Sequence, residues 1–194
     1  MSLTIGFTGH RPNRLHASAE VIERRIGEVL RLIVERRPGP HFAISALAEG
    51  SDRMFARAAI AHHFTLHALF PFITTDYLTT FGEASAMSEF EALCIRALKI
   101  EELTGNLDED GIAYERCGQL IIDRSDVLLA VWDGKPSAGR GGTPEIIEYA
   151  RDKGVPVVSL SALEDWPARV LSRVGRLGLG EATLLEQSTL HLII

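Results

Sequence analysis

The sequence predicts an α/β protein with a three-layer, Rossmann-like fold: an open, mostly parallel sheet with helices on both faces. Short apolar segments alternate with longer amphipathic segments along most of the 194 residues, which is the order expected of βαβ units. Most of the apolar segments are continuous hydrophobic runs, as is typical of parallel strands buried on both faces. No internal repeat interrupts this order, so we expect right-handed crossovers between neighbouring strands.

The chain begins with a strand and a long helix. Residues 3–8 form a short apolar run that ends at Gly9, which predicts a buried first strand. Apolar side chains then recur at helical spacing until Pro38 and Pro40 end the pattern. The residues on this apolar face are Val21, Ile22, Ile26, Val29, Leu30 and Ile33.

A second strand and helix follow, and then a third strand. Residues 42–47 are apolar, and Ser51 or Asp52 is expected to cap a helix that continues to about His63. Residues 66–70 predict the third strand, which Pro71 closes. The elements expected after it are a connecting segment at 72–84, a helix at 85–97, a short strand at 98–103, a polar turn at 105–111 and a helix at 112–124.

The clearest strand of the chain lies at 127–132, where six apolar residues follow one another. A loop over 133–142 leads into a helix at 143–153 and a strand at 155–160. We therefore expect a nucleotide-binding domain over residues 1–160.

The remaining residues, 161–194, are expected to form a C-terminal helix and a tail that pack on the domain or on a partner subunit. The helix is expected over 163–177. The apolar end at 189–194 has the composition of an edge strand or a dimer contact.

Composition restricts the classes of function. The formal net charge of −6 argues against a surface for duplex nucleic acid, which needs an excess of Lys and Arg. Cys94 and Cys117 form no C-x-x-C pair, which fits a reducing compartment. The N-terminus has no signal-peptide pattern, and no apolar run approaches the roughly 20 residues that span a bilayer. We expect a cytoplasmic protein without membrane contact.

The strongest functional signal is the segment Gly139-Arg140-Gly141-Gly142-Thr143-Pro144-Glu145, where a loop enters a helix. Glycines let backbone N–H groups approach an anion, and the start of the helix adds positive potential. Arg140 offers a planar fork for phosphate oxygens, and Thr143 offers either a helix cap or a hydroxyl group for phosphate. The alternative is a tight, well-capped turn without a ligand.

Other predicted turns lie at the carboxyl ends of strands, where open parallel sheets bind their ligands. The expected ligand contacts there are Thr8, Gly9, His10 and Arg11 in the first turn, Glu49, Gly50 and Ser51 in the second, and Asp133 after the strand at 127–132. A glycine after a strand permits close approach of a ligand, and Arg11 suits a phosphate. The alternative for each turn is a plain strand–helix connection with a cap and surface charges.

Several well-known motifs are absent from the sequence. It contains no G-x-G-x-x-G, no G-x-x-x-x-G-K-[ST] and no G-x-S-x-G, which disfavours hydride transfer, a P-loop and an α/β-hydrolase. His62, His63 and His67 lie close in sequence, but the end of a helix and a new strand would separate their side chains. We therefore expect neither a metal site nor a cofactor.

These turns together resemble the SLOG superfamily, the Rossmann-like group that includes the LOG cytokinin phosphoribohydrolases, over about residues 3–160. Ser125-Asp126 and the strand after them, followed by Gly141-Gly142-Thr143 and a glutamate, are similar to the S-D-hydrophobic strand and the G-G-x-G-T-x-x-E motif of LOG enzymes. Residues 45–52, with Pro71 and Asp76-Tyr77, resemble the DNA-processing protein A branch. Residues 126–157 resemble nucleoside 2-deoxyribosyltransferases. The resemblance implies a nucleotide-like ligand at the strand ends.

Two functions follow from this resemblance. In an N-glycosidic bond enzyme, a phosphoribohydrolase or a ribosyl transferase, Glu145 would stabilise the cationic sugar or act as nucleophile or base. Arg116 and Arg140 would hold the phosphate, although Glu145 stands one residue before the position of the family's glutamate. The alternative is a nucleotide-derivative sensor that reports occupancy through oligomerisation. A homodimer or a larger assembly is expected in either case.

Overall fold

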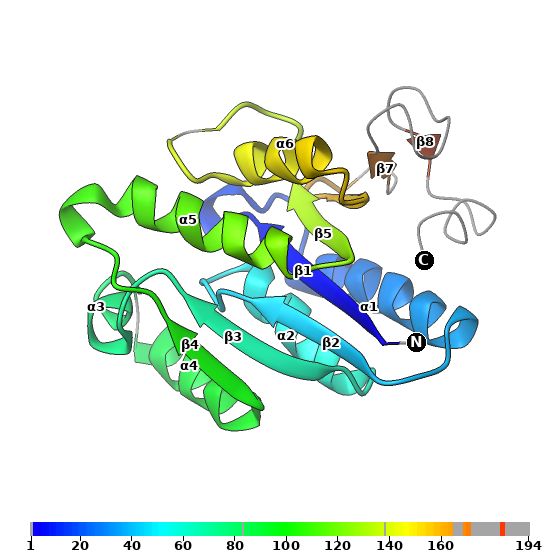
Figure 1. Ribbon diagram of the computed structural model, residues 1–194, viewed down its shortest axis with the longest axis horizontal. Helices are drawn as coiled ribbons and strands as arrows, with labels where there is room; N and C mark the ends of the chain where they lie inside the picture. Colours follow the sequence, from blue (N-terminus) through cyan, green and yellow to red (C-terminus); the bar gives the residue numbers. More distant parts are fainter. Residues whose placement is uncertain (1, 83, 138, 165–168, 172–182, 185–194) are drawn as a thin grey trace.

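The computed structural model describes residues 2–82, 84–137, 139–164, 169–171 and 183–184. Its centre is an open sheet of six parallel strands in the order β4-β3-β2-β1-β5-β6 (Figure 1). Two short antiparallel strands, β7 and β8, extend the sheet beyond β6. The strands are β1 Leu3–Gly9, β2 His41–Ser45, β3 Thr65–Phe70, β4 Lys99–Glu102, β5 Val127–Trp132, β6 Val157–Ser161, β7 Arg169–Leu171 and β8 Thr183–Leu184.

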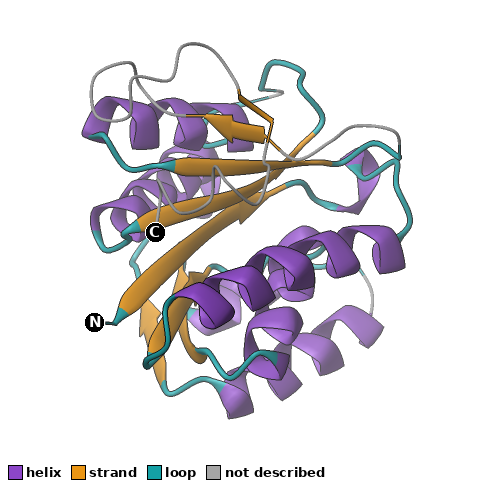
Figure 2. Ribbon diagram, turned by 90° about the vertical axis from the view of Figure 1, so that its right-hand side faces the viewer, coloured by secondary structure: helices purple, strands orange, loops and turns teal. Residues whose placement is uncertain are grey.

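Helices cover both faces of the sheet and complete the three layers (Figure 2). On one face lie α1 Ala19–Arg36, α2 Ser51–Ala61 and α4 Ala84–Arg96, and on the other lie α5 Asp110–Asp123 and α6 Thr143–Lys153. Three short helices lie in the connections: η1 Pro12–Arg14, α3 Thr74–Leu78 and η2 Leu107–Glu109. The predicted α/β class and open, mostly parallel sheet are confirmed.

The order of the strands reverses beside β1. From β1 the chain moves through β2 and β3 to β4 on one side, and it then crosses to β5 and β6 on the other side of β1. The loops that leave β1 and β5 therefore diverge, and their carboxyl ends leave an opening between them. This is the switch point at which ligands of open parallel sheets bind.

The core lies mainly between the sheet and the layer of α1, α2 and α4. Five of the six apolar residues predicted for the inner face of α1 are buried, namely Ile22, Ile26, Val29, Leu30 and Ile33. A smaller apolar cluster joins α6 to β5 and β6. Among the described residues, no helix combines the length and the apolar character needed to cross a bilayer.

Most predicted elements begin and end within about two residues of the observed ones. The strand β5 and the helix α6 have the predicted bounds, Val127–Trp132 and Thr143–Lys153. These two segments have the strongest sequence signals, a continuous apolar run and a glycine at each end of a helix.

The predicted helix caps are wrong. Gly50, with φ of 99°, is the N-cap of α2, and Gly142 is the N-cap of α6, in both cases without a capping side chain. Ser51 and Thr143 are instead the first residues of their helices. The Ser51 hydroxyl donates to the carbonyl oxygen of His10, at 3.0 Å, so a tertiary contact uses the group that a local cap would need.

The prediction of a C-terminal helix over 163–177 is wrong for the part of that segment that the structure describes. Residues Arg169–Leu171 form β7, which pairs antiparallel with β6. Arg25 of α1 holds the chain before β7, because its guanidinium donates to the carbonyl oxygens of Ser161 and Leu163 at 3.0 and 2.7 Å. The expected contact at 189–194 lies outside the described residues, and the division at residue 160 stays a prediction.

Candidate functional site

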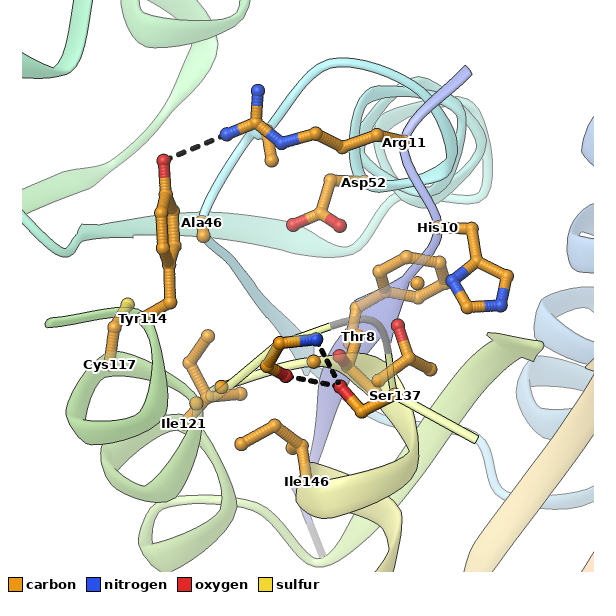
Figure 3. A pocket seen from close by; sticks show the side chains of 18 of the residues that line it. Thr8, His10, Arg11, Ala46, Asp52, Tyr114, Cys117, Ile121, Ser137 and Ile146 are labelled. Carbon is orange, nitrogen blue, oxygen red and sulfur yellow. Dashed lines mark hydrogen bonds between the residues drawn. The ribbon is translucent and has the colours of Figure 1, made fainter. Parts of the chain in front are cut away.

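A cleft of about 310 Å³ opens at the switch point, over the carboxyl ends of β1 and β5 (Figure 3). It extends between the starts of α2 and α6 and the inner side of α5. Eight of the residues predicted to contact a ligand line it: Thr8, Gly9, His10, Arg11, Arg140, Gly141, Gly142 and Thr143. The structure thus brings together two turns that are more than a hundred residues apart in the sequence.

Glu49, Gly50 and Ser51 lie behind this lining and hold it in place. Both the backbone N–H and the hydroxyl of Ser51 donate to the carbonyl oxygen of His10, at 3.2 and 3.0 Å. Glu49 accepts a hydrogen bond from the Gly82 N–H at 3.1 Å and lies 3.9 Å from the guanidinium of Arg11. This turn therefore shapes the first turn from behind.

The contact between these two turns requires glycine at position 9. A Cβ atom there would lie 2.1 Å from the Ser51 hydroxyl oxygen and 3.0 Å from the ring of Phe7. We expect Gly9→Ala to destabilise the protein by about 1–3 kcal/mol, as overpacking does in other buried sites. Urea denaturation measures the change.

The double variant Gly9→Ala/Ser51→Ala is the control for this prediction, because it removes the clashing hydroxyl oxygen. It should be less destabilised than the sum of the two single variants. Additive effects of the two substitutions would contradict a steric role for Gly9.

A buried polar cluster of His10, Asp133 and Arg14 forms one side of the cleft. The Asp133 side chain is 1% exposed. Its Oδ1 lies 3.0 Å from His10 Nε2, and it accepts bonds from Arg14 Nη2 and the Lys135 N–H at 2.7 and 3.0 Å. Its Oδ2 accepts from Arg14 Nε at 3.0 Å. Asp133 therefore fixes two cleft-lining side chains, His10 and Arg14.

The protonation states of this cluster follow from its geometry. Burial would raise the pKa of Asp133, but hydrogen bonds from Arg14, Lys135 and His10 lower that pKa to about 2, so the carboxylate stays ionised. Burial lowers the pKa of His10, and Asp133 offsets only part of this effect. The ring of His10 is therefore neutral at pH 7, and its Nε2–H donates to Asp133, because a carboxylate only accepts.

The loop before α6 presents free backbone donors to the cleft. The carboxylate of Glu145 accepts the N–H of Gly141 at 2.5 Å. The N–H groups of Gly142 and Thr143 have no acceptor among the described residues. Both residues line the cleft, at the positive end of a helix of 11 residues.

Two charged residues predicted for the site lie outside the cleft, and a third lines only its rim. Glu145 is exposed and bonds to its own loop, and it is not part of the cleft lining. Arg140 lines the rim, but its guanidinium pairs with Glu115 at 2.5 Å. Arg116 lines a separate groove beside β4 and η2. The next residue of α5, Cys117, lines the cleft instead. Successive residues of a helix are rotated by about 100°, so the side chain of Arg116 points away from the cleft.

The other end of the cleft contains polar residues that were not predicted for the site. Asp52, Tyr77 and Tyr114 line it together with Arg11. Arg11 donates to the Tyr114 hydroxyl at 2.8 Å, and its guanidinium carbon lies 5.6 Å from the centre of that ring. Figure 3 shows the Asp52 carboxyl group in the cleft near Arg11, on the side of Tyr114.

Asp52 and Tyr77 are both removed from water. Burial raises the pKa of Asp52 to about 7, although the hydroxyl of Ser45 donates to its Oδ2 at 3.0 Å and Arg11 lies near. The Tyr77 side chain is fully buried, and its hydroxyl has no hydrogen-bond partner among the described residues. Burial, with the nearby Asp52, also raises the pKa of Tyr77 well above 10. A buried polar group without a partner at a cleft wall suits contact with a ligand.

Arg14, Asp52, Tyr77 and Tyr114 were missed because each has an ordinary local explanation in the sequence. Asp52 follows a glycine at the start of a helix, where an aspartate normally caps. Only the apolar Met54 and Phe55, two and three residues after it, signal burial. In the described part of the chain, His, Cys, Asp and Glu side chains form no group of three that could hold a metal ion.

No protein-family model and no curated protein matches the chain. Three solved structures are similar in fold. TM1055, a structural-genomics target, is 11% identical with a TM-score of 0.51, over 80% of this chain and 72% of that one. DNA processing protein A from Helicobacter pylori, which binds single-stranded DNA, is 14% identical with a TM-score of 0.53, over 81% of this chain.

DNA processing protein A from Streptococcus pneumoniae is 15% identical with a TM-score of 0.54, over 84% of this chain. The chain spans 64% of the Helicobacter protein and 53% of the Streptococcus protein. At these identities the likeness shows the fold. It confirms the Rossmann-like fold that the sequence predicts.

Proposed function

We propose that the cleft binds a nucleotide or a nucleotide-derived phosphorylated small molecule. The observation that carries this proposal is the polarity of the cleft. Backbone N–H groups at the start of α6 that have no acceptor among the described residues line one end, and buried polar and aromatic side chains line the other. A nucleotide has the same polarity, with an anionic phosphate at one end and a planar ring at the other.

The phosphate is proposed to bind at Gly142, Thr143 and Arg14. The N–H groups of Gly142 and Thr143 have no acceptor in the part of the chain that the structure describes, and the helix dipole favours an anion there. Arg14 Nη1 forms no hydrogen bond among the described residues, whereas Nε and Nη2 are held by Asp133. This orientation makes Arg14 a stronger candidate than Arg140 or Arg116 for a phosphate contact.

The ring is proposed to bind at the opposite end, with the ribose between the two ends. Tyr114 offers an aromatic face there, and Ile121 and Ile146 add apolar wall to the cleft. The Tyr77 hydroxyl and the Asp52 carboxyl group supply a donor and an acceptor that have unused capacity. Small-molecule sites commonly combine such apolar walls with a few convergent polar groups.

Cleavage of an N-glycosidic bond in the bound ligand is a second candidate function. The observation that favours it is the buried Asp52 carboxyl group at the proposed ring end, because an acid there is placed to protonate a leaving base. A sensor that binds without turnover, and assembles into oligomers on binding, is the alternative. Size-exclusion chromatography with and without ligand tests that alternative.

Thermal unfolding with a ligand panel tests the binding proposal. A nucleotide at about 100 times its Kd should raise Tm by about 5–10 °C, from about 2.7 kcal/mol of binding free energy in a chain of this size. The matching nucleoside and ribose 5-phosphate should each raise Tm less, because each fills one end. Oligo-dT in the same assay tests whether the protein binds single-stranded DNA.

The matched variants for this test are Arg11→Gln, inside the cleft, and Arg31→Gln, on the exposed side of α1. Arg11→Gln should weaken nucleotide binding about tenfold, because it removes the charged donor that holds the Tyr114 hydroxyl at the ring end. Arg31→Gln should leave Kd unchanged. A panel in which no nucleotide raises Tm, or in which only oligo-dT does, would contradict the proposal.

A further inference from the structure

Two titratable side chains with complementary properties line the same cleft. His10 follows β1, and Asp52 lies in the first turn of α2. Both are 5% exposed, so the protein rather than the solvent determines their protonation. The backbone carbonyl of His10 is tied to Ser51, which keeps the two turns together. Neither Glu145 nor Arg116, the catalytic residues predicted from the sequence, lines this cleft.

The ring of His10 is held in one tautomer with its other nitrogen free. Nε2 donates to Asp133 at 3.0 Å, and Asp133 is kept ionised by Arg14 and by the Lys135 N–H. Nδ1 therefore carries the lone pair, and it has no partner among the described residues. An imidazole oriented by a buried carboxylate is the arrangement in which a histidine acts as a general base.

The carboxyl group of Asp52 is held from below and open to the cleft. Ser45 donates to its Oδ2 at 3.0 Å. The titratable groups that face it are Arg11, Tyr77 and Cys117, from the loop after β1, from α3 and from α5. The groups that face His10 are Asp133, Arg14 and His16. Arg11 is the cation near Asp52, and it is partly turned to the Tyr114 hydroxyl.

We propose that His10 and Asp52 are a catalytic base and acid that hydrolyse the N-glycosidic bond of the bound ligand, with Asp133 as the residue that positions His10. This proposal rests on the proposed nucleotide site. The aromatic end holds the ring beside Asp52, and the phosphate end holds the ribose phosphate, so the bond between ring and ribose lies within the cleft between them.

The step balances without a further reactant. A water molecule forms a bond from its oxygen to ribose C1′ and gives a proton to His10 Nδ1. The C1′–N bond breaks, and its electron pair leaves with the base, which takes the proton of Asp52. The products are ribose phosphate and the free base. Exchange with solvent returns one proton to Asp52 and removes one from His10, so the net reaction is hydrolysis.

The protonation of the free protein suits these roles. Burial lowers the pKa of His10 below its ordinary 6.5, which leaves Nδ1 ready to accept a proton. Burial raises the pKa of Asp52 to about 7, which keeps a large fraction protonated near neutrality. Two titratable groups whose environments move their pKa values in opposite directions are typical of acid–base pairs.

The test measures base release by chromatography from the 5′-monophosphates of adenosine, guanosine, cytidine, uridine and inosine. Wild-type protein should release a base from at least one of them. His10→Gln and Asp52→Asn should each lower the rate about a hundredfold or more, while the thermal shift with the same nucleotide persists. The matched controls, His62→Gln at the end of α2 and Asp108→Asn in η2, should keep the full rate.

The pH profile separates catalytic roles from structural ones. The value of kcat/KM should fall below the lowered pKa of His10 and above a pKa of about 7 for Asp52, with a maximum between the two. Asp133→Asn should reduce the rate and move the acidic limb to lower pH, because the Asp133 carboxylate raises the pKa of His10. A loss of packing alone would leave that limb unmoved.

Three results would overturn the acid–base pair. Nucleotide binding without any base release would contradict it and leave the proposed binding function intact. The absence of nucleotide binding would contradict both. Release that survives His10→Gln but is lost in Glu145→Gln would return catalysis to the residue expected from the sequence.

Discussion

Asp52→Asn is expected to stabilise the unliganded protein above pH 7 by up to about 4 kcal/mol. The folded protein buries this carboxyl group and raises its pKa from 3.8 to about 7. At about 1.4 kcal/mol per pKa unit, the buried charge costs about 4 kcal/mol once both the folded and the unfolded chain are ionised. Asparagine has similar shape, can accept from Ser45, and carries no charge.

The sign of this effect sets its pH dependence. Because the folded pKa is raised, the stability contributed by Asp52 is complete below the unfolded pKa of 3.8. It is lost progressively as the pH rises to about 7 and stays lost above it. The difference in free energy of unfolding between Asp52→Asn and wild type should therefore grow from about pH 4 to pH 7 and then become constant.

Urea denaturation of both proteins at a series of pH values measures this difference. Asp108→Asn, which changes an exposed aspartate in η2, is the control and should show no comparable pH-dependent gain. A gain in the free energy of unfolding that is the same at pH 4 and pH 8 would contradict a raised pKa for the buried Asp52 carboxyl group. If Asp52→Asn is more stable than wild type and also fails to release a base, then Asp52 supports function at the expense of stability.

Arg14→Met is expected to destabilise the protein by about 3 kcal/mol. Arg14 supplies three of the close hydrogen bonds to Asp133, at 2.7, 2.8 and 3.0 Å. Asp133 is 1% exposed, so its carboxylate would remain buried with His10 and one backbone N–H as partners. Removing one member of a buried ion pair typically costs about 3–5 kcal/mol, because the remaining charge stays desolvated.

A double-mutant cycle with Asp133→Asn tests this explanation. Arg14→Met/Asp133→Asn should be more stable than Arg14→Met, because the second substitution removes the uncompensated charge. Arg31→Met, which breaks the exposed pair with Glu35, should cost no more than about 1 kcal/mol. If Arg14→Met lowers the free energy of unfolding as little as Arg31→Met does, then Arg14 is not needed to stabilise the buried carboxylate of Asp133.

The same Arg14→Met protein also bears on the proposed phosphate site. Arg14 lines the cleft, and its Nη1 forms no hydrogen bond among the described residues. Loss of this cation should weaken nucleotide binding as well as stability. A protein that is destabilised but binds nucleotide normally would restrict Arg14 to supporting Asp133.

The sequence by itself determined the fold and the end of the sheet at which the cleft lies. Hydrophobic periodicity and glycines are local properties, and they placed β5 and α6 at their observed bounds. Parallel strands place their carboxyl ends at one edge of the sheet, where the predicted turns lie. The sequence therefore predicted ligand-binding turns at the glycines before α6 and in the turn after β1. The structure adds that β1 and β5 are the neighbours at the switch point.

Only the tertiary structure decided which side chains face the cleft. Arg116 lies next to cleft-lining Cys117 in sequence but projects into another groove. Asp52, a cap by its local sequence, is drawn inward because Ser51 bonds to His10 and Ser45 reaches its carboxyl group. Asp133 becomes the partner of His10 and Arg14 across more than a hundred residues. Local patterns carry no information about such distant partners, because the direction and protonation of a polar side chain depend on burial and on neighbours that only packing brings together.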